Sequence, residues 1–531
     1  MKGTFRKNLQ IASIRSQSLW NKFKVHTLLQ NSNQKQPSIN AYLGARYSRS
    51  ADSIVDIAKE IIDNNTDAAE RLEKIFHGYG HKSVGDMADL FVCIENIPMF
   101  TAMKIFYLNA VISGQERSTR YQNFQSPEFV KIPKEICSDV DIRKEYEKIM
   151  LKEMADYRRL LKKTKVALKE YFKINEKNRE EKVALQARTF DTARYLLPYG
   201  LNTSMAAVMS ARNWSELISY LNANDDIVDN EIGNLLFNLL GESDIEIPKY
   251  IREADGLIRH TDANCCRRNS TRDVLKYLKE TISKQRKYIN QGCEGDSCLV
   301  KYNENTIEDL ITHYEMLINP LGSKKELEFD FEEGKKVGEI IFENHNNHNL
   351  LGNIGQSGAI KIEGMATLGT LKDLNRHRSF ERFIPLFHDE MDIDNELDRN
   401  NEDCFFLCNY LGIKELDKLR KEYQSSLVGT YSMIKKWRKE SKEYMPEEVS
   451  KEYTKYLLPH AHSTKYCFYA SFDDLQYTIN LRTRKGGHIS YRVLVYKWLE
   501  LLNLQDSIWY SLLKSIEKPD PKSKEQFVDR S

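Results

Sequence analysis

The most concentrated cationic motif in the sequence is Arg376-His377-Arg378. Two guanidinium groups that flank an imidazole offer many hydrogen-bond donors and a delocalised positive charge, which suit a pyrophosphate or a flat anionic ring. A solvated helix turn with two exposed arginines would give the same pattern, and for this motif alone that interpretation is favoured. A binding role for this motif is therefore supported only if other motifs of related chemistry accompany it.

A second candidate lies at residues 116–121, which read Glu-Arg-Ser-Thr-Arg-Tyr after a Ser-Gly turn signal. A hydroxyl and two arginines beside a glycine are typical of a phosphate-binding loop. We expect Ser118 to position a substrate rather than to attack it, because no adjacent His or Lys could activate it. An ordinary surface loop is the competing interpretation.

Two more segments carry similar side chains. Residues 80–86 read Gly-His-Lys-Ser-Val-Gly-Asp and precede a strand-like run. Arg482, with His488 six residues later, lies near the end of a helical segment. Neither segment is specific by itself.

The elements that must position these motifs recur along the chain. Tyr-Leu-Leu-Pro occurs at residues 195–198 and again at residues 456–459, an offset of 261 positions. An Ile-Glu pair followed by apolar residues occurs at residues 94–95 and at residues 362–363. Two echoes in the same order indicate a duplicated domain. We expect a first copy at 1–260, a linker at 261–300 and a second copy at 301–531.

Hydrophobic spacing predicts an α+β fold in which helices dominate. Apolar residues recur every three to four positions over 139–172 and over 51–77, which predicts two amphipathic helices. Short strand-like runs occur at 90–94 and 360–362. The polar, proline-bearing tail from residue 515 to residue 531 is predicted to fray.

Composition excludes several classes of protein. The 531 residues carry 79 Lys and Arg against 77 Asp and Glu, so there is no general attraction to nucleic acid or to an acidic membrane. No apolar run is long enough to span a bilayer, and no secretory signal opens the chain, so we expect a cytoplasmic protein. Cys265, Cys266, Cys293 and Cys298 match no standard zinc spacing, and reduced thiols in a linker are favoured over a metal site.

Taken together and in chain order, these motifs resemble the flavin-dependent thymidylate synthases. The first copy carries the matching segments Gly44–Ser48, Gly80–Asp86, Glu116–Tyr121, Ala193-Arg194 with Leu197-Pro198, and Ala211-Arg212. The second copy carries Arg376-His377-Arg378, Leu458-Pro459, Leu481-Arg482 and His488. The resemblance extends over most of the chain.

Each copy departs from the family pattern where the other keeps it. In the first copy the Arg-His-Arg positions hold Tyr107, Leu108 and Asn109. In the second copy Lys455 takes the place of the phosphate-binding arginine, and residues 379–387 replace the Glu-x-Ser-x-Arg-Tyr loop. This complementary loss predicts that the two copies form a pseudo-dimer with a composite site.

The resemblance implies an activity and a set of roles. The activity is C5 methylation of a uridine nucleotide, from dUMP to dTMP, with FAD as cofactor and with methylenetetrahydrofolate and NADPH as co-substrates. The implied cofactor-binding residues are Arg376, His377, Arg378, Arg212, His488, Ser48, Ser83 and Asp86. The implied substrate-binding residues are Glu116, Ser118, Arg120, Arg194 and Arg482, of which Arg482 and Ser118 are also the candidate catalytic residues. By the same resemblance a homodimer would be equivalent to the family's tetramer.

Two alternatives stay open. The same fold could modify C5 of a different pyrimidine nucleotide, which the rewritten residues 379–387 and Lys455 favour. A non-catalytic relative could keep the fold and bind only flavin or nucleotide.

Overall fold

The computed structural model describes residues 9–15, 23–30, 36–63, 71, 82–108, 112–119, 124, 127–241, 264–266, 269–277, 298–302, 332, 335–336, 339–340, 360–505 and 510–530. The chain divides into two compact units. Unit 1 comprises residues 1–144, 200–289 and 440–456, and unit 2 comprises residues 145–199, 290–439 and 457–531. Each unit therefore takes segments from both halves of the sequence.

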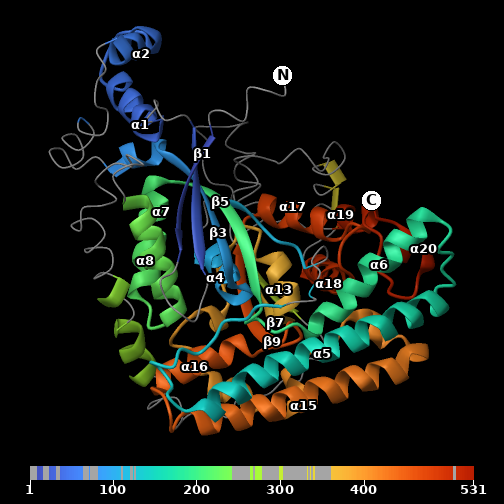
Figure 1. Cartoon of the computed structure of the whole chain (residues 1–531). Coiled ribbons are helices and arrows are strands. Elements are labelled where there is room, and N and C mark those ends of the chain that lie inside the picture. The colour runs from blue at the N-terminus through green and yellow to red at the C-terminus, as the bar shows by residue number, and fades with distance from the viewer. Residues whose placement is uncertain are drawn as a thin grey trace. The chain divides into compact units, whose positions relative to one another are not determined.

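Unit 1 is built on a five-stranded antiparallel sheet with the order β1-β2-β3-β5-β4. The strands are β1 (Leu9–Arg15), β2 (Lys24–Gln30), β3 (Asp89–Pro98), β4 (Ser113–Glu116) and β5 (Asn202–Ser210). Figure 1 shows α7 (Ala211–Ala223) and α8 (Ile227–Gly241) along this sheet. Other helices described in this unit are α1 (Gln36–Tyr47), α2 (Ile54–Asp63), the short 3-10 helix η1 (Lys82–Met87), α4 (Met99–Leu108) and α16 (Glu447–Tyr456).

Unit 2 is built on a four-stranded antiparallel sheet with the order β6-β7-β9-β8. The strands are β6 (Cys298–Tyr302), β7 (Ile360–Thr367), β8 (Glu381–Phe383) and β9 (Ser463–Ala470). The helices that matter for the site are α6 (Arg179–Ala193), η2 (Arg194–Leu196), α13 (Leu368–Leu374), α17 (Phe472–Arg482), α18 (Ile489–Gln505) and α20 (Lys524–Val528). The shorter helices are η4 (Pro385–Phe387), α14 (Ile393–Leu397), η5 (Asn401–Cys404), η6 (Asn409–Gly412), η7 (Lys414–Leu416) and α19 (Tyr510–Ser515).

Two long helices lie side by side in unit 2 and run antiparallel (Figure 1). They are α5 (Val140–Tyr171), most of which belongs to this unit, and α15 (Asp417–Ser441). Lys152 donates to the carbonyl of Ser426 at 3.0 Å, and two turns further along α5 Arg159 donates to Glu422 at 2.9 Å. Apolar side chains at three-to-four spacing close the seam, so the helix predicted over residues 139–172 is confirmed.

The order of elements occurs twice along the chain. The strand order β2-β3-β5-β4 has the same antiparallel arrangement as β6-β7-β9-β8. In each case a helix follows the second strand directly, α4 after β3 and α13 after β7. The α+β class with dominant helices is confirmed, and so are the strands predicted at 90–94 and 360–362. The helix predicted over 51–77 is described only as α2, and most of its second half lies outside the described residues.

The two Tyr-Leu-Leu-Pro segments are hydrogen-bonded to each other in antiparallel register. Within unit 2 the amide of Tyr199 donates to the carbonyl of Leu458 at 3.0 Å, and the amide of His460 donates to the carbonyl of Leu197 at 2.9 Å. These two bonds are related by the same 261-residue offset, with Pro198 opposite Pro459. The rings that follow the prolines, Tyr199 and His460, stack with centroids 4.4 Å apart.

The C-terminal tail is folded, so the prediction that it frays was wrong. It ends in α20, and the ring of Phe527 is 1% exposed. Phe527 stacks on Phe172 with centroids 4.0 Å apart and packs edge-on against Tyr410. One well-placed aromatic residue therefore anchors a segment whose composition is otherwise polar. Among the described residues, none of the helices has both the length and the hydropathy that a bilayer span requires.

Candidate functional site

Arg482 and His377 are in direct contact, although 105 positions separate them in the sequence. Arg482 is the last residue of α17, and His377 lies in the turn that follows α13. The Nε of Arg482 donates to the Nε2 of His377 at 2.6 Å, and the other ring nitrogen of His377 lies 2.9 Å from the hydroxyl of Thr478. The guanidinium of Arg482 also lies over the ring of Tyr491 at 5.3 Å.

This arrangement determines the protonation state of His377. An arginine has only donors, so Nε2 must accept and the proton must sit on Nδ1, which donates to Thr478. Burial, and then the positive charges of Arg482 and Arg382, hold the pKa of His377 well below its usual 6.5. The imidazole is therefore neutral at physiological pH, and it holds Arg482 in one orientation.

The two arginines on either side of His377 occupy different environments. Arg376 is exposed and Arg378 is partly exposed, whereas His377 is 6% exposed. The backbone of His377 continues the turn, since its amide donates to the carbonyl of Leu374 at 3.0 Å. The triplet therefore presents its guanidiniums outward and turns its imidazole inward.

His488 is buried and is bonded to the protein's own backbone. Its Nε2 lies 3.0 Å from the carbonyl of Asp191, and its Nδ1 accepts from the amide of Ser490 at 3.1 Å. The ring also stacks against Tyr195. Both ring nitrogens are thus engaged in this structure, and a cofactor-binding role for His488 stays a prediction.

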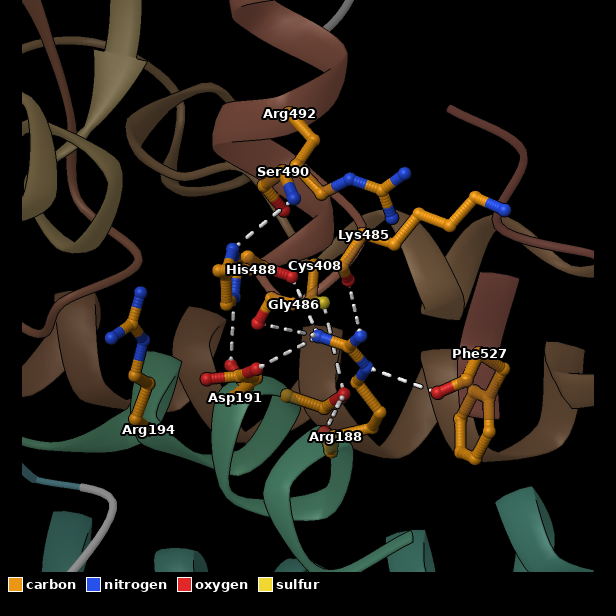
Figure 2. A network of polar contacts seen from close by, with 12 residues as sticks. Arg188, Asp191, Arg194, Cys408, Lys485, Gly486, His488, Ser490, Arg492 and Phe527 are labelled. Atoms are coloured by element: carbon orange, nitrogen blue, oxygen red, sulfur yellow. Dashed lines mark hydrogen bonds and ion pairs between the residues drawn. The ribbon is translucent and has the colours of Figure 1, made fainter. Parts of the chain in front are cut away.

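Arg188, which the sequence analysis did not select, organises the loop between Arg482 and His488 (Figure 2). Its guanidinium donates to the carbonyls of Lys485 and Gly487, both at 2.6 Å. It also donates to the carbonyls of Phe527 at 3.3 Å and Asp529 at 3.2 Å. One arginine, 1% exposed, therefore ties this loop to the C-terminal tail.

Ionic contacts reinforce the same link. The ammonium of Lys485 lies within 3.3 Å of three tail carboxylates, those of Glu517, Glu525 and Asp529. Arg492, at the start of α18, donates to the carbonyl of Thr483 and to the side chain of Gln526. Because the loop starts directly after Arg482, the tail braces a candidate site residue.

Arg194 is buried and is paired with a carboxylate of unit 2. Its Nη2 donates to Asp373 at 2.7 Å, and the two side chains are 7% and 17% exposed. Burial lowers the pKa of Arg194, but the carboxylates of Asp373 and Asp191 more than offset this and the pKa is raised. The guanidinium is charged, and its partner in this structure is internal.

The candidate residues of unit 1 include one exposed ion pair. Arg212, in the first turn of α7, lies 3.1 Å from Asp86 of η1. Ser48, just after α1, donates to the carbonyl of Ala45. The helix α1 approaches η1 closely at Gly44, where a Cβ would lie only 2.1 Å from the sulfur of Met87. Ser83 lies on η1, and its side chain is outside the described residues.

The predicted phosphate loop is only partly described. Glu116 ends β4 and is 9% exposed, and Ser118 is partly exposed two residues later. Arg120 lies outside the described residues. Cys265 and Cys266 are described as free thiols, whereas Cys293 lies outside the described residues. Within the described ranges no cluster of three His, Cys, Asp or Glu side chains could hold a metal ion.

Comparisons with known proteins agree with the motifs. The model of the thymidylate synthase complementing protein family matches residues 27–248. A UPF0159 protein from Chlamydia pneumoniae is 22% identical over 464 residues, which cover 83% of this chain and 80% of the relative. That similarity reaches well past the segment that the family model matches, into the second occurrence of the elements. Residues 27–248 are therefore similar to the thymidylate synthase complementing protein family, and the resemblance to the flavin-dependent thymidylate synthases is confirmed.

Proposed function

We propose that this chain methylates C5 of a uridine nucleotide, of the dUMP-to-dTMP type, with methylenetetrahydrofolate and a reduced flavin. The observation that carries the proposal is the contact between Arg482 and His377. Two residues chosen separately from the sequence meet at hydrogen-bond distance, and a third group, Thr478, orients the imidazole. The family match over residues 27–248 supports the same chemistry.

The donors of the triplet suit FAD. Arg376 and Arg378 present guanidiniums toward the surface of the turn after α13, and such groups bind a pyrophosphate by charge-assisted hydrogen bonds. His377 is not part of this donor set, because both its nitrogens are used internally. In unit 1, Arg212 offers a further exposed guanidinium. Bound flavin would supply the reducing equivalents for the methylation, with NADPH as the source of electrons.

Arg482 would act on the pyrimidine. A positive charge held against a uracil carbonyl stabilises the negative charge that develops on the ring when C5 becomes nucleophilic. Neutral His377 fixes the guanidinium without adding a competing charge. Glu116 and Ser118 would position the nucleotide, with Arg194 on its phosphate.

We further propose that the two copies pair as a pseudo-dimer. The antiparallel bonding of the two Tyr-Leu-Leu-Pro segments, with its 261-residue symmetry, supports this pairing. The complementary losses in the two copies are consistent with it. A homodimer of the chain would then have the same number of copies as a family tetramer.

The test is turnover by an Arg482→Ala variant. We expect formation of dTMP to fall on the order of 10²–10³-fold, as when one donor of an oxyanion hole is removed, while flavin binding is retained. Replacement of the exposed Lys421, on α15, serves as the control and should leave both unchanged. Undiminished turnover by the Arg482 variant would exclude the proposed role. Screening UMP and other pyrimidine nucleotides alongside dUMP identifies the substrate.

A further inference from the structure

The C-terminal half of α5 carries exposed positive charge that the balanced composition of the whole chain conceals. Residues 158–169 contain six Lys and Arg and no acidic residue, whereas residues 140–157 contain four Lys and Arg against five Asp and Glu. Four of the six cations recur every three or four positions, which places them on one face of the helix. This face, here called the α5 stripe, consists of Arg158, Lys162, Lys165 and Lys169.

The opposite face of α5 is buried, and this fixes the direction of the stripe. The buried side chains are Tyr157, Leu160, Thr164 and Leu168, each at most 3% exposed. The hydroxyl of Thr164 is hydrogen-bonded to that of Tyr423 on α15 at 2.7 Å. All four cations of the stripe are exposed. At 1.5 Å per residue, the stripe presents its charges to solvent along about 17 Å of a helix that packing holds in place.

The carboxylates around the stripe cancel only part of its charge. Lys165 and Lys169 share the single carboxylate of Glu176, at 3.3 Å and 2.6 Å from the two ammonium groups. Lys162 has neither a hydrogen-bonding nor an ionic partner within the described ranges. The three lysines of the stripe thus face one carboxylate.

An ordinary solvated helix face would carry a different pattern. Such faces commonly alternate the sign of charge, so that neighbours three or four positions apart attract each other. In the stripe each of the three neighbouring pairs is like-charged, which destabilises the helix. The helix dipole favours cations only in the last turn, whereas the stripe begins more than three turns before α5 ends. The pattern therefore favours a polyanionic partner.

The two remaining cations of the segment serve as a contrast. Arg159 and Lys163 turn toward α15, where both pair with Glu422, at 2.9 Å and 2.6 Å. They hold the two long helices together and are not available in the same way. The segment therefore separates structural cations on one side from solvent-facing cations on the other.

We propose that the α5 stripe binds the sugar–phosphate backbone of a double-stranded nucleic acid without reading its sequence. A basic stripe along a helix is the electrostatic footprint of such binding. A single strand would also call for aromatic side chains on which its bases stack, and residues 158–169 include none. A membrane-bound helix would insert apolar side chains, but the apolar face of α5 is buried in the protein. This binding is separate from the methylation proposed above.

The contact should depend strongly on salt, because it is electrostatic. If each of the four cations neutralises one phosphate, a plot of log association constant against log salt has a slope of about −3.6. A rise in NaCl from about 50 to about 200 mM should then weaken binding on the order of 100-fold. Fluorescence anisotropy of the full chain with labelled RNA and DNA duplexes of about two helical turns measures both quantities and shows which duplex is preferred.

A triple Lys→Gln variant of the stripe tests the proposal. Glutamine keeps a long side chain with good helix propensity, so the variant loses three charges without disturbing the core. We expect the slope to fall to about −0.9 and the affinity at low salt to fall on the order of 100-fold or more. The control variant loses the same charge from exposed lysines outside the stripe and should leave both quantities unchanged. Its substitutions are Lys148→Gln, Lys439→Gln and Lys518→Gln.

The outcomes decide the inference independently of the methylation. Circular dichroism and urea unfolding show whether both variants fold as the wild type does. A loss of duplex binding confined to the stripe variant supports the inference whether or not the protein makes dTMP. An equal loss in both variants overturns it, because overall charge would then explain the binding. It is overturned too if neither duplex binds at low salt, or if a single strand or phosphatidylserine vesicles bind more tightly than both duplexes.

Discussion

Three buried histidines of unit 2 should make its stability depend on pH in a predictable way. His377, His460 and His462 are all under 7% exposed. Burial is the main reason that each has a pKa well below 6.5, and nearby cations add to the effect. Each therefore stays neutral in the folded protein while it becomes protonated in the unfolded chain. Folding stability is lost as the pH falls through 6.5.

The size of the effect follows from proton linkage. A histidine with an unfolded pKa of 6.5 that stays neutral when folded costs about 1.4 kcal/mol at pH 5.5 and almost nothing at pH 7.5. Three such histidines cost about 4 kcal/mol together. Glu153 acts in the opposite sense. Burial raises its pKa well above 4.5, so its contribution to the stability of the folded protein increases as the pH falls. The net change is thus smaller than the histidines alone would give.

Single variants isolate each histidine from that background. We would measure the free energy of unfolding in urea at pH 7.5 and pH 5.5, for the wild type and for each His→Gln variant. Each variant should reduce the loss between the two pH values by about 1.4 kcal/mol. Leu494→Ala, in the buried core of the same unit, should lower stability equally at both pH values. If the histidine variants showed the same pH dependence as the wild type, the neutral buried state would be refuted.

Three other predictions follow from the contacts. His377→Phe removes the hydrogen-bond acceptor of Arg482. Because a charged hydrogen bond contributes about 1.5–3 kcal/mol, we expect kcat to fall about 10- to 100-fold while flavin stays bound. Steady-state kinetics measure kcat and absorbance measures bound flavin, and an unchanged kcat contradicts the prediction. Phe527→Ala should destabilise unit 2 by about 3–5 kcal/mol. Because the C-terminal tail then no longer holds the loop after Arg482, trypsin should cleave faster after Lys485. An unaltered digestion pattern would contradict the role of the tail in holding this loop. Lys104→Met leaves the carboxylate of Asp229 buried without its 2.6 Å partner and should cost about 3–5 kcal/mol in urea unfolding, while the double variant with Asp229→Leu should recover most of the loss.

Local patterns predicted the elements well but not their assembly. The helix over 139–172 followed from apolar spacing, and the Tyr-Leu-Leu-Pro echo identified two segments that are hydrogen-bonded to each other. The interleaved units could not be predicted, because they depend on contacts between residues hundreds of positions apart. Periodicity carries no information about such partners.

In the candidate site, too, the sequence indicated the residues but not how they are arranged. Arg482 and His377 were found from residue type, but the inward turn of the imidazole toward Thr478 depends on packing. Arg188 escaped notice because nothing in its neighbourhood distinguishes it from a surface arginine of α6. Phe527 was the one signal that the tail is folded, since a lone aromatic residue in a polar segment is commonly an anchor.

The most direct test of the proposed function is the visible absorbance spectrum of the full chain after incubation with FAD and gel filtration. We predict that the protein fraction carries the bands of oxidised flavin, and that Arg376→Ala combined with Arg378→Ala removes them without loss of folded protein. A colourless wild-type fraction under the same conditions would contradict the flavin site and the methylation proposed from it.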